Sequence, residues 1–157
     1  MTPFGQDFHF ARTLGLQMIE RGGGSCKMAI AIDSERHFNP HGVAHGGVAY
    51  TLADTAMGGA LSSLLDDDQW CATLEIKCNY HVGVREGLLT CEAQVVHRGK
   101  RIANIDARLF QDGRMVCSAN GNFAIFAAPD AAREKGADSA EPAPLALDQT
   151  LALDQNR

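Results

Sequence analysis

Apolar and polar residues alternate along residues 70–80 (WCATLEIKCNY), with most of the apolar residues at even-numbered positions. A period of two is typical of a β-strand with one buried face, so the even-numbered side chains are predicted to face the core. Residues 88–97, 102–110 and 115–126 show similar patterns. The links between these strands are short, and one contains the hairpin signal Asp-Gly, so the four strands are predicted to pair antiparallel.

The first third of the chain predicts shorter elements. Residues 6–13 have the pattern of a short amphipathic helix. Residues 14–20 and 26–32 are predicted to be two strands, and the RGGGS sequence between them is predicted to be a turn because clustered glycines permit positive φ.

Residues 48–64 are apolar nearly all round and predict a long helix of about 20 residues that is buried on most sides. Gly58 and Gly59 each weaken such a helix by ~1 kcal/mol relative to alanine. We therefore expect the backbone of the sheet or of another helix to approach closely at these two glycines. A sheet curled around one central helix satisfies both patterns.

Composition fits a single globular domain, with 45% apolar and 21% charged residues in a chain of 157. The net charge of −5 gives no basic footprint for nucleic acid or an anionic membrane. No stretch approaches the ~20 apolar residues of a membrane span, and the N-terminus lacks the pattern of a secretory signal. The five cysteines are odd in number and none are at C-x2-C spacing, which favours reduced thiols in a cytoplasmic protein over disulfides or a zinc site.

The composition changes after residue 127. Residues 128–157 are rich in Ala, Pro and Asp and contain the sequence LALDQ twice. We predict a domain over residues 1–127 followed by a mobile tail, with a short docking helix as the alternative.

One carboxylate, Asp54, interrupts the apolar helix. Aspartate is a poor helix former away from the N-terminus, and no Lys, Arg or His stands three or four positions away to explain it. Two interpretations remain open. Asp54 is either a tolerated aspartate that meets water at a groove, or a carboxylate held in a pocket for chemistry, where burial would make it a stronger base.

The sequence His45-Gly46-Gly47 stands at the predicted start of the helix. The first N–H groups of a helix have no partner inside the helix, and the helix dipole favours negative charge there. Two glycines leave these N–H groups unobstructed, so an oxyanion could bind at this point. The alternative is that the glycines only permit a tight turn into the helix.

His45 and Asp54 are nine positions apart, which corresponds to about 900° of helical rotation and ~13 Å along the axis. The two side chains are therefore predicted to face opposite sides of the helix. One chain cannot readily place Asp54 beside an oxyanion at its own Gly46, whereas two paired helices can. The spacing predicts a dimer with its sites at the subunit interface.

The stretch NPHGVAHGGVAYTLAD, residues 39–54, resembles the N-x-x-G-x-x-H-G-G-x6-D signature of hotdog-fold acyl-CoA thioesterases. The similarity is greatest to the PaaI-like (phenylacetate-degradation) branch of the 4-hydroxybenzoyl-CoA thioesterase superfamily. It extends over roughly residues 14–127 and includes TLEIKCNY, HRGKR and DGRMVCSANG. The resemblance implies an α+β hotdog fold, in which an antiparallel sheet of about six strands wraps a long helix. It also implies dimers that often pair into tetramers and hydrolysis of acyl-CoA thioesters without a metal or cofactor.

The resemblance assigns roles to five residues of the motif and its neighbourhood. It implies that Asp54 attacks the thioester or activates water, and that the Gly46 amide polarises the carbonyl. Asn39 and His45 would orient and polarise the thioester, and Thr73 would help to hold the water. Alternative roles remain for Asn39 as a turn residue and for His45 as a structural contact at the helix start.

Further residues are candidates for substrate contact. Gly47 shares the exposed amides of the motif, and the expected walls of the acyl pocket are Tyr50, Met57, Leu61 and Trp70, for which core packing is an equal explanation. A basic cluster of Arg98, Lys100 and Arg101 could meet the phosphates of CoA or form a solvated hairpin tip.

The sequence does not identify the acyl group or choose between nucleophilic and general-base catalysis. Two alternative functions stay open, a hotdog hydratase or dehydratase and a non-catalytic acyl-CoA binding or sensing protein. The spacing from HGG to the aspartate disfavours the first, and the presence of Asp54 argues against the second.

Overall fold

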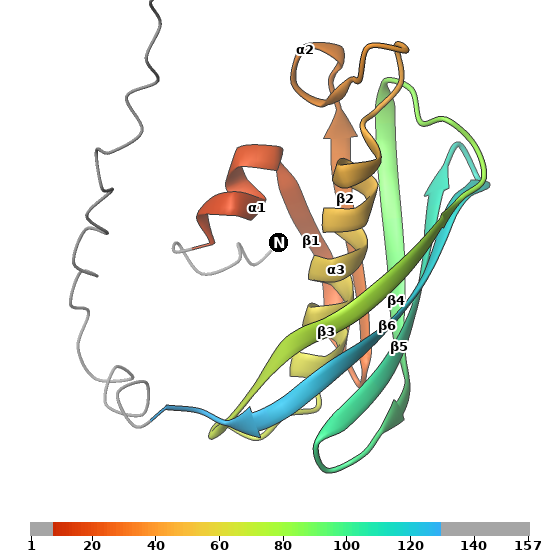
Figure 1. The fold of residues 1–157 in the computed structure, drawn as a ribbon. Coiled ribbons are helices and arrows are strands. Elements are labelled where there is room, and N and C mark those ends of the chain that lie inside the picture. Colours follow the sequence, from red (N-terminus) through yellow and green to blue (C-terminus); the bar gives the residue numbers. More distant parts are fainter. Residues whose placement is uncertain (1–7, 130–157) are drawn as a thin grey trace, which may run out of the picture.

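One six-stranded antiparallel sheet curls around a single long helix (Figure 1). The computed structural model describes residues 8–129, so the predicted tail lies outside the described residues beyond residue 129. The elements follow in the order α1 (His9–Leu14), β1 (Leu16–Gly22), β2 (Ser25–Ile32), α2 (Ser34–His37), α3 (Gly46–Ser62), β3 (Gln69–Tyr80), β4 (Gly87–Arg98), β5 (Ile102–Gln111) and β6 (Arg114–Ala127). The predicted α+β architecture is confirmed.

The strand order in the sheet is β1-β2-β4-β5-β6-β3, and every neighbouring pair is antiparallel. The hairpins β4–β5 and β5–β6 follow the short links that the sequence predicted. β3 returns to pair with β6, which leaves one long edge of β3 without a partner strand among residues 8–129. Ala128 continues the ordered chain past β6, because it is buried and its amide donates to Asp68.

The helix α3 lies in the concave side of the sheet and supplies the centre of the core (Figure 1). It has 17 residues, slightly fewer than expected, because its cap residue is His45 and it ends at Ser62. Met57 and Leu61 are completely buried, which matches the core-packing explanation left open for them, and a part in the acyl pocket stays a prediction. Each is a core side chain whose burial contributes about 1.5–3 kcal/mol.

The two helical glycines have different surroundings. A Cβ built on Gly59 would lie 2.8 Å from the Sγ of Cys26, so β2 does approach closely there, through a side chain rather than through backbone. No atom lies within 4 Å of a Cβ built on Gly58. The expectation of close approach is therefore wrong for Gly58, which faces open space in the described chain.

A bulge between Thr73 and Glu75 breaks the predicted alternation of β3. Before the bulge Thr73 pairs with the buried Phe123, whereas after it Ile76 pairs with Gly121. Odd-numbered residues therefore face α3 in the first part of the strand and even-numbered residues in the second. A bulge inserts one residue and so exchanges the two faces, which a period of two cannot reveal.

Trp70 consequently lies on the outer face of the sheet. It pairs with Phe126, and both side chains are exposed, by 47% and 42%. The core-packing explanation of Trp70 is therefore wrong, because the bulge directs its side chain away from the helix, and a part in the acyl pocket stays a prediction.

Candidate active site

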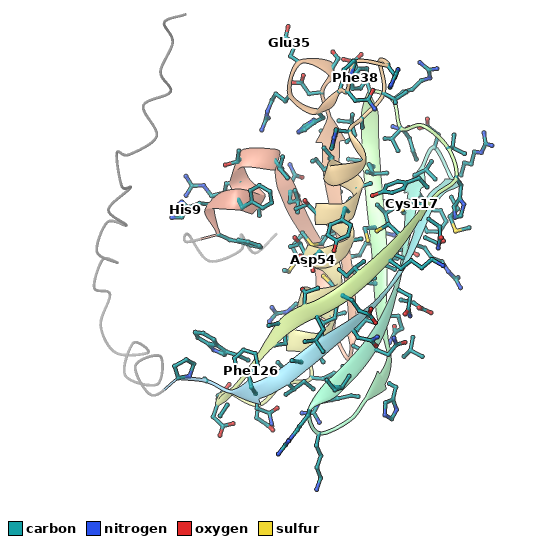
Figure 2. The ribbon with its side chains drawn as sticks, in the orientation of Figure 1. His9, Glu35, Phe38, Asp54, Cys117 and Phe126 are labelled. Atoms are coloured by element: carbon teal, nitrogen blue, oxygen red, sulfur yellow. The ribbon has the colours of Figure 1, made fainter. Side chains whose placement is uncertain are left out.

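Asp54 lies in the middle of α3, on the side that faces β3 (Figure 2). The hydroxyl of Thr73 donates a hydrogen bond of 2.7 Å to its Oδ1. The carboxylate is half-buried, on the side of α3 that packs against β3, the edge strand of the sheet. The structure thus brings together Asp54 and Thr73, the two residues that the resemblance associates with water activation.

The groups around Asp54 are held in their neutral forms. Burial and the charge of Asp54 raise the pKa of the Cys71 thiol, and burial followed by the same charge raises the pKa of the Tyr50 hydroxyl. Tyr50 precedes Asp54 by one helical turn and is exposed by 37%, and its place near the substrate stays a prediction. Cys71 was not predicted at the site, because only the bulged register of β3 turns it toward α3.

His45 caps the N-terminus of α3. Its Nδ1 accepts the Gly47 N–H at 3.0 Å, and its carbonyl oxygen accepts the Val48 N–H at 2.9 Å. The Gly46 N–H has no acceptor among residues 8–129. An imidazole that accepts at Nδ1 carries its proton on Nε2 in the neutral tautomer, so His45 and Gly46 both present donors at this end of the helix.

A cavity of about 280 Å³ adjoins this helix end. Its lining includes Tyr80, Val82 and Val84 from the end of β3 and the segment after it, and His45, Gly46 and Ala49 from the beginning of α3. Asp54 is not among the residues that line it, so the described chain holds the candidate oxyanion donor and the candidate carboxylate in two separate places. No pattern in the sequence pointed to the contribution from Tyr80, Val82 and Val84.

Asn39 shapes the loop before α3. Its side-chain oxygen accepts the His41 N–H at 2.9 Å, and its backbone amide donates to the Val43 carbonyl at 2.8 Å. Gly42 in the same turn has φ of +72°, which only glycine adopts without strain. These contacts match the turn role that was left open for Asn39.

The basic cluster of the β4–β5 hairpin lies far from this loop (Figure 1). Arg98 donates to the side chain of Gln69 at the beginning of β3, with a distance of 2.9 Å. Tyr80, at the other end of β3, contacts Gly46. Within one chain, Arg98, Lys100 and Arg101 are therefore not brought to the N-terminus of α3.

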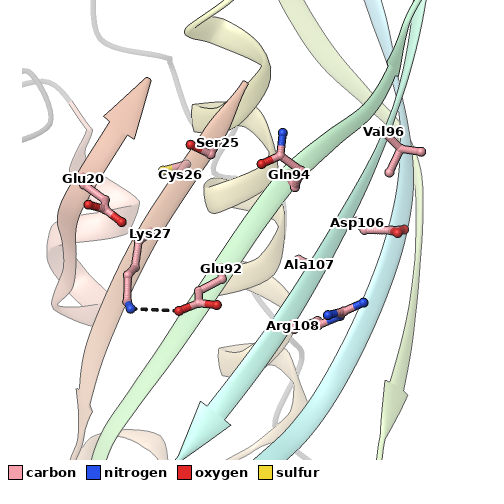
Figure 3. Close-up of a pocket in the computed structure, with 10 residues that line it drawn as sticks. All are labelled: Glu20, Ser25, Cys26, Lys27, Glu92, Gln94, Val96, Asp106, Ala107 and Arg108. Carbon is pink, nitrogen blue, oxygen red and sulfur yellow. Dashed lines mark hydrogen bonds and ion pairs between the residues drawn. The ribbon is translucent and has the colours of Figure 1, made fainter. Parts of the chain in front are cut away.

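A second and larger hollow, of about 510 Å³, lies on the outer face of the sheet (Figure 3). Its side chains are mostly polar and include the Lys27–Glu92 ion pair at 2.8 Å. Neither Asp54 nor Gly46 reaches it. The larger hollow is therefore separate from the candidate site residues.

The described part of the chain shows no group of three or more His, Cys, Asp or Glu side chains placed to hold a metal ion. No helix within residues 8–129 is long and apolar enough to cross a membrane.

Residues 41–118 match the model of the thioesterase superfamily. PA1618 of Pseudomonas aeruginosa, named a thioesterase in a solved mutant structure, is 31% identical over 114 residues, which cover 71% of this chain and 78% of that protein. The 1,4-dihydroxy-2-naphthoyl-CoA hydrolase of Listeria monocytogenes is 28% identical over 88 residues, 56% of this chain and 71% of the relative. The chain belongs to the thioesterase superfamily.

Solved structures agree with this assignment. The conserved protein PA5202 from Pseudomonas aeruginosa has a TM-score of 0.71 and 32% identity, covering 74% of this chain and 93% of that chain. The E. coli PaaI protein from the phenylacetic acid degradation operon has a TM-score of 0.70 and 25% identity, covering 76% and 85%. The hotdog fold and the similarity to PaaI-like proteins, both expected from the sequence, are confirmed.

Proposed function

We propose that this protein hydrolyses an acyl-CoA thioester to the free acid and CoA. The observation that carries the proposal is Asp54, a lone carboxylate on an apolar helix that is oriented by the Thr73 hydroxyl at 2.7 Å. The named activity of the Listeria relative, hydrolysis of an aromatic acyl-CoA, supports the same class of reaction.

In the proposed reaction, Asp54 either attacks the thioester carbonyl or removes a proton from the attacking water. Direct attack forms a bond between the carboxylate oxygen and the acyl carbon, the C–S bond breaks, CoA leaves as the thiolate, and water then cleaves the mixed anhydride. In the water route, the oxygen of water bonds to the acyl carbon as Asp54 takes its proton, the C–S bond breaks, and CoA leaves as the thiolate, which can take the proton from Asp54. Both routes use the negative charge of Asp54, and neither requires a metal to activate the already electrophilic thioester.

The Gly46 N–H is the proposed donor to the oxyanion. Both routes place negative charge on the thioester oxygen, and a preorganised N–H at a helix N-terminus stabilises such a charge. Gly46 has this N–H free of acceptors among residues 8–129, whereas the Gly47 N–H is already used by His45. Gly46 is therefore the better candidate of the two glycines.

The proposed site is shared between two chains. Asp54 faces β3, whereas the cavity at the N-terminus of α3 excludes Asp54. The long edge of β3 has no partner strand in the described chain, and such an edge is a ready template for pairing with another chain. Pairing through this side would bring the Asp54 of one chain toward the helix N-terminus of the other.

The test is hydrolysis of a panel of aryl and aliphatic acyl-CoAs, measured by the release of free CoA thiol. Asp54→Asn keeps the shape and removes the charge, so kcat is expected to fall by about 10² or more while the fold is retained. Thr73→Val removes a hydrogen bond to a charged group, worth ~1.5–3 kcal/mol, and should lower kcat/KM by roughly tenfold or more. Asp112→Asn, an exposed aspartate in the β5–β6 hairpin, is the matched control.

Near-normal turnover by a folded Asp54→Asn protein would reject the assignment of this residue. A wild-type protein that binds acyl-CoA without releasing thiol would instead indicate a binding or sensing protein. Hydration of an enoyl-CoA with the thioester left intact would indicate a hydratase.

A further inference from the structure

The side chain of Tyr80 lies directly against the first turn of α3. Its hydroxyl donates to the Gly46 carbonyl at 3.1 Å, and a Cβ built on Gly46 would lie 3.3 Å from the Cζ of Tyr80. Tyr80 is the last residue of β3 and pairs with Cys117 of β6. The sheet, and not the loop before α3, therefore supplies this hydroxyl.

The Gly46 carbonyl does not depend on Tyr80 for a hydrogen bond. Inside an α-helix, the carbonyl at this position accepts the N–H of the residue four places later. A carbonyl oxygen has two lone pairs, so the Tyr80 hydroxyl supplies a second bond. Because the helical bond already satisfies this oxygen, the main effect of the second bond is to restrict the orientation of the peptide.

The peptide between Gly46 and Gly47 is consequently held at both ends. Tyr80 donates to its oxygen, and its N–H donates to the Nδ1 of His45 at 3.0 Å. Glycine has the greatest backbone freedom of any residue, and helix ends fray. The side chains of Tyr80 and His45 thus make the first turn of α3 rigid, although it would otherwise be the least rigid part of the helix.

The Tyr80 hydroxyl also stays a donor over a wide pH range, because burial raises the pKa of Tyr80 to about 12. The Gly46 N–H lies next to the peptide that Tyr80 and His45 hold, and it has no acceptor among residues 8–129. An oxyanion donor is effective only when it is held in place before the charge develops.

We propose that Tyr80 is a positioning residue, whose hydroxyl fixes the Gly46–Gly47 peptide so that the adjacent Gly46 N–H stays directed at the thioester oxygen. The proposal rests on the proposed thioesterase function. The Tyr80 ring also lines the cavity at this helix end, but the role proposed for its hydroxyl is to position the peptide. The predicted effect is therefore on the transition state more than on substrate binding.

The test is Tyr80→Phe, which keeps the ring and removes the hydroxyl. We expect kcat to fall about five- to tenfold with KM within about twofold, because the oxyanion exists only in the transition state. The melting temperature should stay unchanged. The matched control is Thr90→Val, which removes another hydroxyl that donates to a backbone carbonyl, that of Phe110 at 3.4 Å, away from the site.

A second measurement reports the position of the peptide without any activity. In protein labelled with ¹⁵N-glycine, the exchange rate of the Gly47 amide with solvent is compared between wild type and Tyr80→Phe. We expect exchange at Gly47 to become several-fold faster, because the peptide loses one of its two anchors. The Gly58 amide in the middle of α3 should be unaffected, and Thr90→Val should alter neither amide.

Several results would overturn this role. Unchanged Gly47 exchange means that Tyr80 does not hold the peptide, and unchanged kcat means that holding it does not matter. A higher KM at constant kcat points to substrate contact, and a parallel loss of melting temperature points to a structural role. Asp54→Asn separates the two proposals: if it is inactive while Tyr80→Phe matches wild type, only the role of Tyr80 fails. If wild type hydrolyses none of the acyl-CoAs, the thioesterase function itself fails, and the role of Tyr80 is rejected with it.

Discussion

Two glycines on the same helix are predicted to respond in opposite ways to the same substitution. Gly58 has open space where a Cβ would be added, with no atom within 4 Å. Alanine is favoured over glycine in a helix interior by ~1 kcal/mol. Gly58→Ala is therefore expected to raise the free energy of unfolding by about 1 kcal/mol, or the melting temperature by roughly 2–4 °C.

Gly46→Ala adds the same methyl group at the other end of α3. Its Cβ would lie 3.3 Å from the Cζ of Tyr80, a tight contact, but Tyr80 is exposed by 54% and its ring has room to shift. We expect the free energy of unfolding to change by less than ~0.5 kcal/mol. The methyl group occupies the approach to the Gly46 N–H and displaces the Tyr80 hydroxyl, so kcat/KM should fall at least about tenfold, equivalent to ~1.4 kcal/mol.

The assay combines thermal unfolding with initial rates on the best acyl-CoA of the panel. Gly58→Ala should keep at least about half of wild-type kcat/KM, since its methyl lies about three turns from Gly46. Wild-type kinetics in Gly46→Ala would refute close approach of the thioester at this amide. A Gly58→Ala protein that is less stable than wild type would contradict the prediction that residues 8–129 leave room for this methyl group.

Two further predictions concern the assembly and the alkaline limit of stability. Asp54→Asn and Gly46→Val chains that are mixed, dissociated and reassociated should recover roughly a quarter of wild-type activity. Half of the random dimers are mixed, and each mixed dimer has one intact site of two. Inactivity despite subunit exchange would place both residues in one chain's site. Burial raises the pKa of Cys26 to about 11 and of Cys117 to about 12, so the unfolded chain loses these protons at lower pH than the folded chain. The free energy of unfolding should therefore fall as pH rises from about 9 to 11. A denaturant midpoint that stays level over this range would contradict it.

Local patterns in the sequence were sufficient for the long elements. The strands β4, β5 and β6 alternate over most of their length despite irregularities at Val95/His97 and Leu109/Phe110, and short turns join them, so both their existence and their antiparallel pairing could be predicted. The helix α3 was evident from its continuous apolar residues, and Asp54 was evident because it is the exception among them. These features depend on a few neighbouring residues and on no distant partner.

Features that depend on distant partners were missed. The short helix α2 ends at His37, a polar residue that is only 2% exposed. The His37 ring accepts the Asp33 N–H at 2.9 Å through Nδ1 and lies 3.2 Å from the Leu14 carbonyl through Nε2. The His37 carbonyl in turn accepts the His45 N–H at 2.7 Å, which joins this loop to the cap of α3. A histidine in a polar segment gives no sign of such a role until Leu14 is known to lie beside it.

The strand β3 shows most clearly where periodicity stops being informative. Strict alternation would direct Trp70 and Leu74 toward α3 and would direct Thr73 away from Asp54. The resemblance to thioesterases required Thr73 to lie near Asp54, so the two lines of inference from the sequence were in conflict. The bulge between Thr73 and Glu75 resolves the conflict, because it exchanges the two faces of the strand. Thr73, which precedes the bulge, and Tyr80, which follows it, therefore both face α3. One inserted residue thus allows a single strand to orient the carboxylate in the middle of α3 and to hold the peptide at its N-terminus.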